Sequence, residues 1–258
     1  MAQALPADRV NAVPPIMGAQ DAARTAGLDC RVVSAIYIGR TEDYRPIYEA
    51  VCRMGPGHLL VGGAEALAFN CLALEAQLEV ARRRAAGRAL PPTCRTPRNR
   101  NAVPVVAEIA PQAGLNCSID EAAIIGVSID NRFIYEAGCR DEVGAWLEAD
   151  GEGWIVTDCI TVAAQGGECR FTTRIERAER AQRWLATSPA AEPAPRCTVL
   201  DARYMGSGPS GGWYETICAG AEGVAVRLDG AGVVAEVLRC ADAQGIGGGC
   251  RARPSTGE

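Results

Sequence analysis

Cysteine is the residue type in this chain with the most obvious chemistry. The twelve cysteines fall into three sets of four, and the smallest spacing within a set is ten residues, in Cys159 to Cys169 and in Cys240 to Cys250. Zinc sites usually use closer pairs such as C-x-x-C. An even number of cysteines in regular sets therefore predicts a disulfide framework, with metal ligation or buried thiols as the alternatives.

Arginine supplies the second candidate, since all 26 basic residues are arginines and none is lysine. Seven of them form a run that contains no acidic residue: Arg82, Arg83, Arg84, Arg88, Arg95, Arg98 and Arg100. Guanidinium groups bind carboxylates and phosphates through paired hydrogen bonds. The run therefore predicts a binding site for a protein partner with an acidic surface, or for an anionic envelope component such as lipid headgroups. The alternative is a solvated helix face that Glu75 and Glu79 partly neutralise.

Patterns typical of catalysis are sparse. The single histidine, His58, follows Gly-Pro-Gly, and no G-x-S-x-G nucleophile motif accompanies it, so we expect an ordinary surface or half-buried side chain. Residues 206–212, GSGPSGG, formally satisfy G-x-G-x-x-G, but the strand-like segment WYETIC follows them where a dinucleotide site needs a helix. This favours a hairpin loop. The neighbouring carboxylates at 141–142 and 150–152 are expected in turns. We therefore expect no catalytic residue, no metal and no cofactor.

Bulk composition narrows the class of protein. The net charge of -5 argues against a nucleic-acid partner, and the lack of lysine excludes Schiff-base chemistry. No apolar run approaches the roughly 18 residues of a transmembrane segment, and no signal-peptide hydrophobic region is present. Together with the cysteines, this predicts a mature periplasmic or secreted chain. Residues 2–4, Ala-Gln-Ala, are then the remnant of a cleavage motif, or the true start lies nearby.

The cysteines belong to a repeat of about 80 residues. Its three copies begin with CRVVSAIYIG (30–39), CSIDEAAIIG (117–126) and CTVLDARYMG (197–206), and a segment ending in Tyr-Glu-x-x-Cys follows each. Short runs of β-branched and aromatic residues between glycine-rich turns predict four sequential strands per copy, which form an antiparallel meander. The expected fold class is α+β, with three tandem disulfide-stapled modules. Each is a four-stranded antiparallel meander with short helices on one face.

The repeat also predicts the divisions of the chain. In the first division, Asp21 is expected to cap a helix and Gly27 to end it. A Pro/Ala-rich linker before the third module is expected to act as a hinge. The divisions are an N-terminal helical lead-in (1–29), module 1 with the Arg-rich insertion (30–94), a connector helix (95–116), module 2 (117–169), a helix and linker (170–196) and module 3 (197–258).

Meander geometry favours one pairing of the cysteines, because the start of the first strand and the ends of the second and fourth strands lie at the same edge. The favoured pairs are Cys30–Cys52, Cys71–Cys94, Cys117–Cys139, Cys159–Cys169, Cys197–Cys218 and Cys240–Cys250. Four cysteines also allow other connectivities, and the sequence leaves them open.

Residues that occur in all three copies are interpreted as structural. The Tyr-Glu dipeptides at 48–49, 135–136 and 214–215 are the main example. Alternate positions of a strand place Tyr and Glu on opposite faces of the sheet. A binding face repeated in each copy is the alternative.

The layout as a whole, a helix or helix pair followed by four antiparallel strands in tandem disulfide-linked copies, resembles the β-lactamase-inhibitor-protein architecture and the related PepSY-type module. This resemblance implies binding of another protein through a concave sheet face. We therefore expect a non-catalytic extracytoplasmic binding protein, such as a subunit, scaffold or inhibitor-like partner in a bacterial envelope assembly. The alternatives are a hydrolase of glycans or the cell wall, which needs two carboxylates about 5 to 9 Å apart in one cleft, and a thiol or metal protein.

Overall fold

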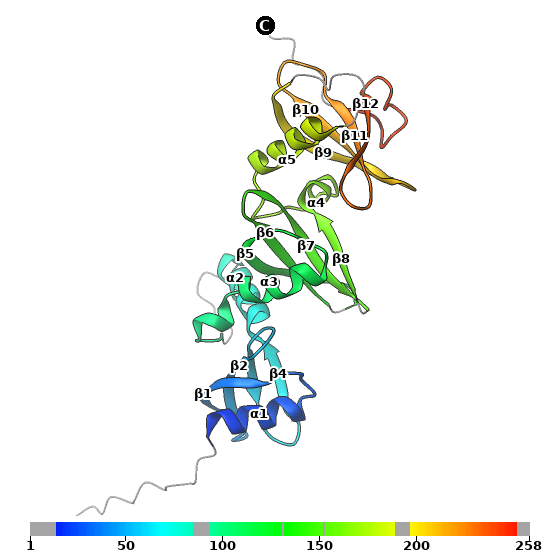
Figure 1. The fold of residues 1–258 in the computed structure, drawn as a ribbon. Helices are drawn as coiled ribbons and strands as arrows, with labels where there is room; N and C mark the ends of the chain where they lie inside the picture. The colour runs from blue at the N-terminus through cyan, green and yellow to red at the C-terminus, as the bar shows by residue number, and fades with distance from the viewer. Residues whose placement is uncertain (1–13, 85–92, 131, 152, 189–196, 252–258) are drawn as a thin grey trace, which may run out of the picture. The chain divides into compact units, whose positions relative to one another are not determined.

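A computed structural model describes residues 14–84, 93–130, 132–151, 153–188 and 197–251. It contains three four-stranded antiparallel sheets, in the orders β1-β2-β3-β4, β5-β6-β7-β8 and β9-β10-β11-β12, joined by short helices (Figure 1). The predicted α+β fold of three tandem meanders is confirmed. The chain divides into two compact units, residues 1–108 and residues 109–258, of which the second holds two of the sheets.

The first module consists of α1 (Pro15–Thr25), β1 (Val32–Arg40), β2 (Pro46–Cys52), β3 (His58–Val61), β4 (Leu67–Asn70), α2 (Cys71–Arg84) and the 3-10 helix η1 (Pro97–Arg100). The second consists of α3 (Val103–Gln112), β5 (Ile119–Val127), β6 (Phe133–Cys139), β7 (Glu142–Asp150), β8 (Gly153–Asp158) and α4 (Cys159–Ala164). The third consists of α5 (Arg174–Thr187), β9 (Val199–Gly208), β10 (Gly211–Cys218), β11 (Val224–Leu228) and β12 (Val234–Arg239). No helix in the part of the chain that the structure describes is long and apolar enough to span a membrane.

The first strand of each module carries two β-bulges at corresponding positions. The extra residues are Val33 and Ile38 in β1, Asp120 and Ile125 in β5, and Leu200 and Met205 in β9. An extra residue turns the following side chains to the other face of the strand. The three first strands therefore share the same pairing register with their second strands, as well as a similar composition.

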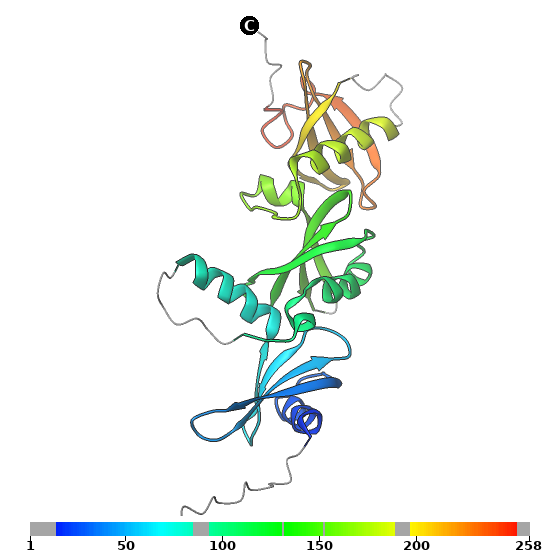
Figure 2. The same cartoon turned by 90° about the vertical axis from the view of Figure 1, so that its left-hand side faces the viewer.

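Each sheet has a helix face and an opposite face. In the first module α1 covers the face that carries Tyr48, Ala50 and Leu60, and these residues form one core with α1 (Figure 2). In the third module α5 takes the place of α1, because its residues Ala181 and Trp184 share a core with the sheet. The helix predicted between the second and third modules, within residues 170–196, thus belongs to the third core.

The helix ends match the sequence in one respect and differ in another. Gly27 ends α1 in the left-handed region, at a φ of 69°, as expected of a glycine at this position. Asp21 was expected to cap the start of α1, and this is wrong: Asp21 lies inside the helix, which begins at Pro15 after Pro14. Proline suits the first turn because its missing N–H has no partner there in any case.

The aligned glycines at the start of each third strand are required by close packing. A Cβ on Gly144 would collide with the carbonyl oxygen of Ala137, and one on Gly223 would collide with that of Thr216. In the first module a Cβ on Gly57 would collide with the side chain of Asn99. At these positions a neighbouring carbonyl or side chain lies so close to the glycine backbone that no other residue fits.

All twelve cysteines form disulfides: Cys30–Cys52, Cys71–Cys94, Cys117–Cys139, Cys159–Cys169, Cys197–Cys218 and Cys240–Cys250. Their Cα atoms lie 5.2 to 5.8 Å apart. This is the connectivity that the meander favours. Six disulfides in one chain are typical of proteins from oxidising compartments.

The second and third modules share one hydrophobic core. Ile160 of α4 packs in the same cluster as Trp184 and Tyr214 of the third module, with Val143 of β7 against it. The Tyr214 hydroxyl also donates a hydrogen bond of 3.0 Å to Asp158. These contacts oppose the hinge that the Pro/Ala-rich linker suggested, because bending there would separate buried apolar side chains.

Candidate functional site

The Tyr-Glu dipeptides place a fully buried carboxylate in every module. Glu49, Glu136 and Glu215 are 1%, 0% and 0% exposed, and each lies on the face opposite the tyrosine that precedes it. The segment that follows the last cysteine of the module crosses this face and supplies backbone N–H donors to the carboxylate. The prediction that Tyr and Glu lie on opposite faces agrees with this arrangement. The burial of the glutamates was not predicted, since glutamate is rarely found fully buried.

Glu49 accepts hydrogen bonds at both of its carboxylate oxygens. It accepts the backbone N–H groups of Arg95 and Thr96 at 2.7 and 2.8 Å and the side-chain amide of Asn99 at 2.9 Å. Burial alone would raise the pKa of Glu49, but these donors outweigh it and lower the pKa. Glu49 is therefore ionised in the folded protein at neutral pH.

Glu136 is less well satisfied. One carboxylate oxygen accepts the backbone N–H of Phe171 at 2.8 Å, while the other has no hydrogen-bond partner among the described residues. Burial raises the pKa of Glu136, and the backbone N–H groups of Phe171 and Arg170, with the charge of Arg170, offset only part of this effect. The second module thus holds a carboxyl group whose pKa lies above its ordinary value.

Glu215 forms an ion pair with an arginine whose side chain is partly buried. Arg203 approaches it at 2.7 Å, and the backbone N–H of Arg251 donates to it at 2.9 Å. Ile36 and Ala123 occupy the positions that correspond to Arg203 in the other two modules. The structural role of the repeated glutamate is therefore constant, whereas its charge balance differs from module to module.

Each buried glutamate lies beside the second disulfide of its module. A carboxylate oxygen and two sulfur atoms lie within 4.8 Å of one another in the groups Glu49/Cys71/Cys94, Glu136/Cys159/Cys169 and Glu215/Cys240/Cys250. All these sulfur atoms are in disulfides, and thiolates rather than disulfides are the metal ligands. The groups therefore hold the segment that crosses the sheet, and in the oxidised protein they lack the ligands of a zinc site.

His58 is more buried than expected, at 8% exposed. Its Nδ1 atom lies 3.7 Å from the sulfur of Cys52, which is bound to Cys30. Burial lowers the pKa of His58 to about 4. The imidazole is therefore neutral at physiological pH and packs in the interior, which opposes a role as a solvent-accessible general base.

Two carboxylates share a cavity of about 440 Å³ at the junction of the second and third modules. Glu142 forms an ion pair with Arg180 at 3.5 Å. Asp158 accepts hydrogen bonds from the first turn of α4 and from Tyr214. Burial and the charge of Asp158 raise the pKa of Tyr214. Because both carboxylates are bound within the protein, this cavity does not present the free acid and base of a glycosidase.

The described members of the arginine run are on the surface of the first module. Arg82, Arg95 and Arg98 are exposed, and the described residues offer none of them an ion-pair partner. Arg100 differs, because it donates two hydrogen bonds of 2.9 Å to Glu75. The side chains of Arg83, Arg84 and Arg88 lie outside the described part of the chain. The structure therefore leaves three described arginines available for an external anion.

Arg95 also belongs to the repeat. This correspondence was not predicted from the sequence, because the whole arginine run was interpreted as unique to the first module. An arginine follows the last cysteine in every module, as Arg95, Arg170 and Arg251. The backbone of Arg95 and that of Arg251 bind the buried glutamate. The sequence carries this signal as a Cys-Arg dipeptide in each copy. Arg82 and Arg98 have no such structural role.

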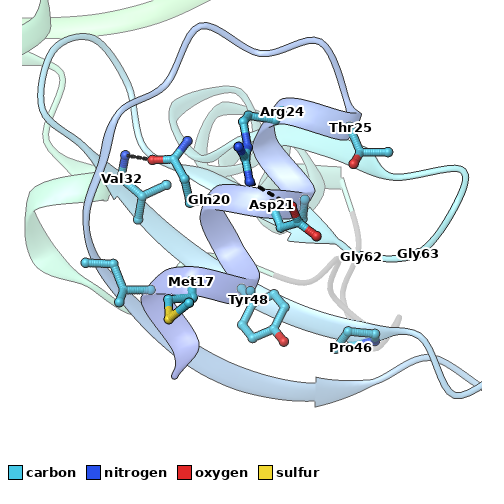
Figure 3. Close-up of a pocket in the computed structure, with 13 residues that line it drawn as sticks. Met17, Gln20, Asp21, Arg24, Thr25, Val32, Pro46, Tyr48, Gly62 and Gly63 are labelled. Carbon is cyan, nitrogen blue, oxygen red and sulfur yellow. Dashed lines mark hydrogen bonds and ion pairs between the residues drawn. The ribbon is translucent and has the colours of Figure 1, made fainter. Parts of the chain in front are cut away.

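A cavity of about 710 Å³ opens beside α1 in the first module (Figure 3). Met17, Ala22 and Arg24 line it from the helix, and Pro46 and Tyr48 line it from β2. The turn after β3, residues 62–63, lies at its rim. A Cβ on Gly18 would collide with the hydroxyl of Tyr48, so the helix backbone contacts the ring directly.

The cavity beside α1 has both apolar and polar residues in its lining. Tyr48 and Ala22 are buried, whereas Met17 is 61% exposed. Asp21 and Arg24 form an exposed ion pair of 2.9 Å on the same helix (Figure 3). A concave, largely apolar site of this volume with a few polar groups is typical of ligand-binding pockets. Sequence reasoning missed it because each lining residue is unremarkable in isolation.

No protein family matches the sequence, and no curated protein resembles it at a significant level.

Proposed function

We propose that this chain is an extracytoplasmic, non-catalytic binding protein of the periplasm or the extracellular space, and that it acts through contacts with another protein. The observation that carries the proposal is the exposed position of Arg82, Arg95 and Arg98 without ion-pair partners among the described residues. Guanidinium groups in this state favour carboxylates on a partner. The six disulfides support a location outside the cytoplasm.

Two further observations support a binding role. The only histidine is buried, and the carboxylates of the junction cavity are engaged within the protein. The layout, which resembles that of β-lactamase-inhibitor-type and PepSY-type modules, is also compatible with contacts to a protein. The preferred partner has an acidic surface, since charge complementarity accelerates association and determines its specificity.

Photo-crosslinking in the native envelope fraction tests the proposal, because amine-reactive reagents need lysine. We would place a photoreactive residue at Val80, which is exposed on α2 two residues before Arg82, and in a control protein at Val233, which is exposed in the third module. The expected result is a stoichiometric protein partner linked at position 80 and absent at position 233. Repeated failure to link any partner at position 80 would contradict the proposal.

Charge reversal then tests the role of the arginines. Arg98→Glu should weaken the captured complex several-fold, and the effect should diminish at high salt because screening shortens the range of charge interactions. Arg183→Glu makes the same change in net charge at an exposed position of α5 and should leave the affinity unchanged. Equal effects of the two substitutions would assign the binding to overall charge rather than to this surface.

A further inference from the structure

The covering helices of the first and third modules can be aligned by a shared side-chain hydrogen bond. The Gln20 side chain of α1 accepts the backbone N–H of Val32 at 2.8 Å, and that of Gln182 in α5 accepts the N–H of Val199 at 3.1 Å. Val32 and Val199 occupy corresponding positions of the first strands. The buried residues of α1, Ala19, Ala22 and Ala23, therefore correspond to those of α5, Ala181, Trp184 and Leu185.

This alignment explains why the first module has a cavity beside its helix. In the third module the indole of Trp184 packs on the ring of Tyr214, with centroids 5.0 Å apart. Tyr48 corresponds to Tyr214, but Ala22 stands in the position of Trp184. Ala22 and Tyr48 both line the cavity. The cavity thus lies beside the residue where the third module has an indole.

The remaining aromatic contact is the same in the two modules. Tyr37 meets Tyr48 edge to face at 5.9 Å, and Tyr204 meets Tyr214 in the same way at 5.3 Å. The third module therefore contains three contacting rings, and the first contains two of them with open space beside the second. The first module thus has the two tyrosines, Tyr37 and Tyr48, but no side chain that corresponds to the indole of Trp184.

We propose that the cavity beside Tyr48 binds a tryptophan side chain presented by a protein partner. This inference rests on the proposed binding function and adds the chemistry of the partner. The geometry is taken from the protein itself, since Trp184 on Tyr214 shows how an indole packs against this platform. Aromatic pairs of this kind add about 0.5–1.5 kcal/mol beyond their burial. Tryptophan is also among the residues that contribute most to protein interfaces.

The lining of the cavity fits such a side chain. Met17, on the wall, has a polarisable thioether that packs favourably against aromatic rings. Gln20 is engaged by the backbone of β1 and gives the wall a fixed position (Figure 3). Asp21 and Arg24 at the mouth can meet the polar backbone of a bound peptide, because their ion pair is exposed. An apolar anchor within a polar rim is the usual anatomy of an interface.

The chain does not supply an obvious occupant of its own. Residues 1–13, which precede the described part of α1, contain no aromatic residue. Of the four tryptophans, Trp184 is buried and Trp146, Trp154 and Trp213 are only partly exposed. A ring from a different polypeptide is therefore the occupant that the chemistry favours.

Binding of N-acetyl-tryptophanamide to the full chain tests the site directly. We expect weak binding, with a Kd of about 1 mM, reported by NMR shifts of the Met17 methyl group. Ala22→Trp should abolish binding and raise Tm, because the new indole fills the cavity. Ala186→Trp, at an exposed position of α5, should leave binding intact. No shift at Met17 in the wild type, or equal binding by the Ala22→Trp protein, would overturn the inference.

Two additional measurements separate this inference from the proposed function. If Ala22→Trp proves unfolded, Ala22→Leu provides partial filling and should weaken binding of the amide without abolishing it. Peptides selected from a random library on the wild type, and depleted on the cavity-filled protein, should contain tryptophan; peptides without an aromatic residue would contradict the inference. A partner captured near Arg82 with an affinity that Ala22→Trp does not change would sustain the binding function and refute the tryptophan site.

Self-association is the remaining outcome. Sedimentation of the wild type and of the Ala22→Trp protein should show the same monomeric species. A dimer that the substitution dissociates would place a ring of a second copy in the cavity, and the inference of a different partner would then be wrong.

Discussion

The carboxylate of Glu49 accepts the backbone N–H of Arg95 at 2.7 Å, and Arg95 directly follows Cys94 in the chain. The second disulfide of the module therefore fixes the donor that a buried carboxylate needs. Glu215 and Arg251 repeat this relation in the third module at 2.9 Å. The disulfide thus holds the residue before one peptide bond, and the carboxylate binds the N–H of the residue after it. Both interactions fix the same segment against the sheet.

Glu49→Gln should destabilise the first module. The amide that replaces one carboxylate oxygen would face an N–H donor, since both oxygens of Glu49 accept hydrogen bonds. A buried donor left without an acceptor costs about 1–3 kcal/mol. Hydrogen exchange of β2 and β3 in the full chain would measure this loss. Unchanged exchange would show that the carboxylate contributes little to the fold.

Glu136→Gln provides a matched comparison with the opposite expectation. Only one oxygen of Glu136 accepts a hydrogen bond, and a glutamine amide can retain that acceptor. Because burial raises the pKa of Glu136, its carboxyl group stabilises the fold most below its ordinary pKa, and this contribution is lost as pH rises through the raised value. The substitution should therefore be neutral or stabilising at pH 7. A loss as large as that of Glu49→Gln would contradict this.

The pH dependence of Glu49 has the reverse sign. Its pKa is lowered in the folded protein, so its contribution to stability is present above the ordinary value and is lost as pH falls through the lowered value. Hydrogen exchange at a series of acidic pH values should show the first module losing this contribution while the second module gains that of Glu136. If both modules gained or both lost stability as the pH fell, the opposite pKa shifts of Glu49 and Glu136 would be wrong.

His58 should make the first module acid-sensitive over a higher range of pH. Burial lowers the pKa of His58 to about 4, so the unfolded chain binds more protons than the folded one below the ordinary value of about 6.5. Up to roughly 3 kcal/mol of stability should be lost as pH falls from about 6.5 to about 4. His58→Gln should remove this component and leave partner binding unchanged. Loss of binding at pH 7 in a folded His58→Gln protein would indicate a functional role.

Trp184→Ala should open in the third module a cavity like that of the first. Removal of a buried aromatic side chain costs about 3–5 kcal/mol, and the shared core with Ile160 should transmit part of the loss to the second module. Added indole should restore some of the stability, because apolar cavities of this kind bind small aromatic molecules. Thermal unfolding with and without indole measures both effects. The absence of any rescue would argue against Tyr214 as an aromatic platform.

Reduction should unfold the chain. Titration in denaturant should find no free thiol, because all twelve cysteines are paired. Closing a loop of about 20 residues contributes roughly 3 kcal/mol in the chain-entropy model, and each module contains two disulfides. Circular dichroism before and after reduction would measure the loss of folded structure. Retention of the native spectrum in a reductant that exposes all thiols would show that the apolar cores suffice.

The sequence was sufficient for the fold because the repeat contains its own controls. The aligned glycines, the four cysteine positions and the Tyr-Glu pair each occur in all three copies, so a chance pattern could be set aside. The site was harder to predict. Ala22 is an ordinary helix residue, and its meaning appears only when the hydrogen bonds of Gln20 and Gln182 align it with Trp184. The helices differ in their distance from the first cysteine, and alignment by sequence alone therefore misses the correspondence.

Burial of the glutamates shows a second limit. A Tyr-Glu pair in a strand predicts one apolar and one solvated face, and the sequence contains no local signal for the segment that later covers Glu136. That information lies more than thirty residues away, in the backbone of Phe171. Almost every residue carries a backbone N–H, so neither composition nor spacing shows which one will donate to a given carboxylate.

The paired bulges of β1, β5 and β9 have a consequence for biosynthesis. Each first strand must find its correct register against the second strand while the chain is still emerging from the ribosome. A first strand that paired without either bulge would turn Ala35 or its counterparts away from the helix face. Two bulges in fixed positions thus penalise register-shifted pairing during folding, and they do so equally in all three copies.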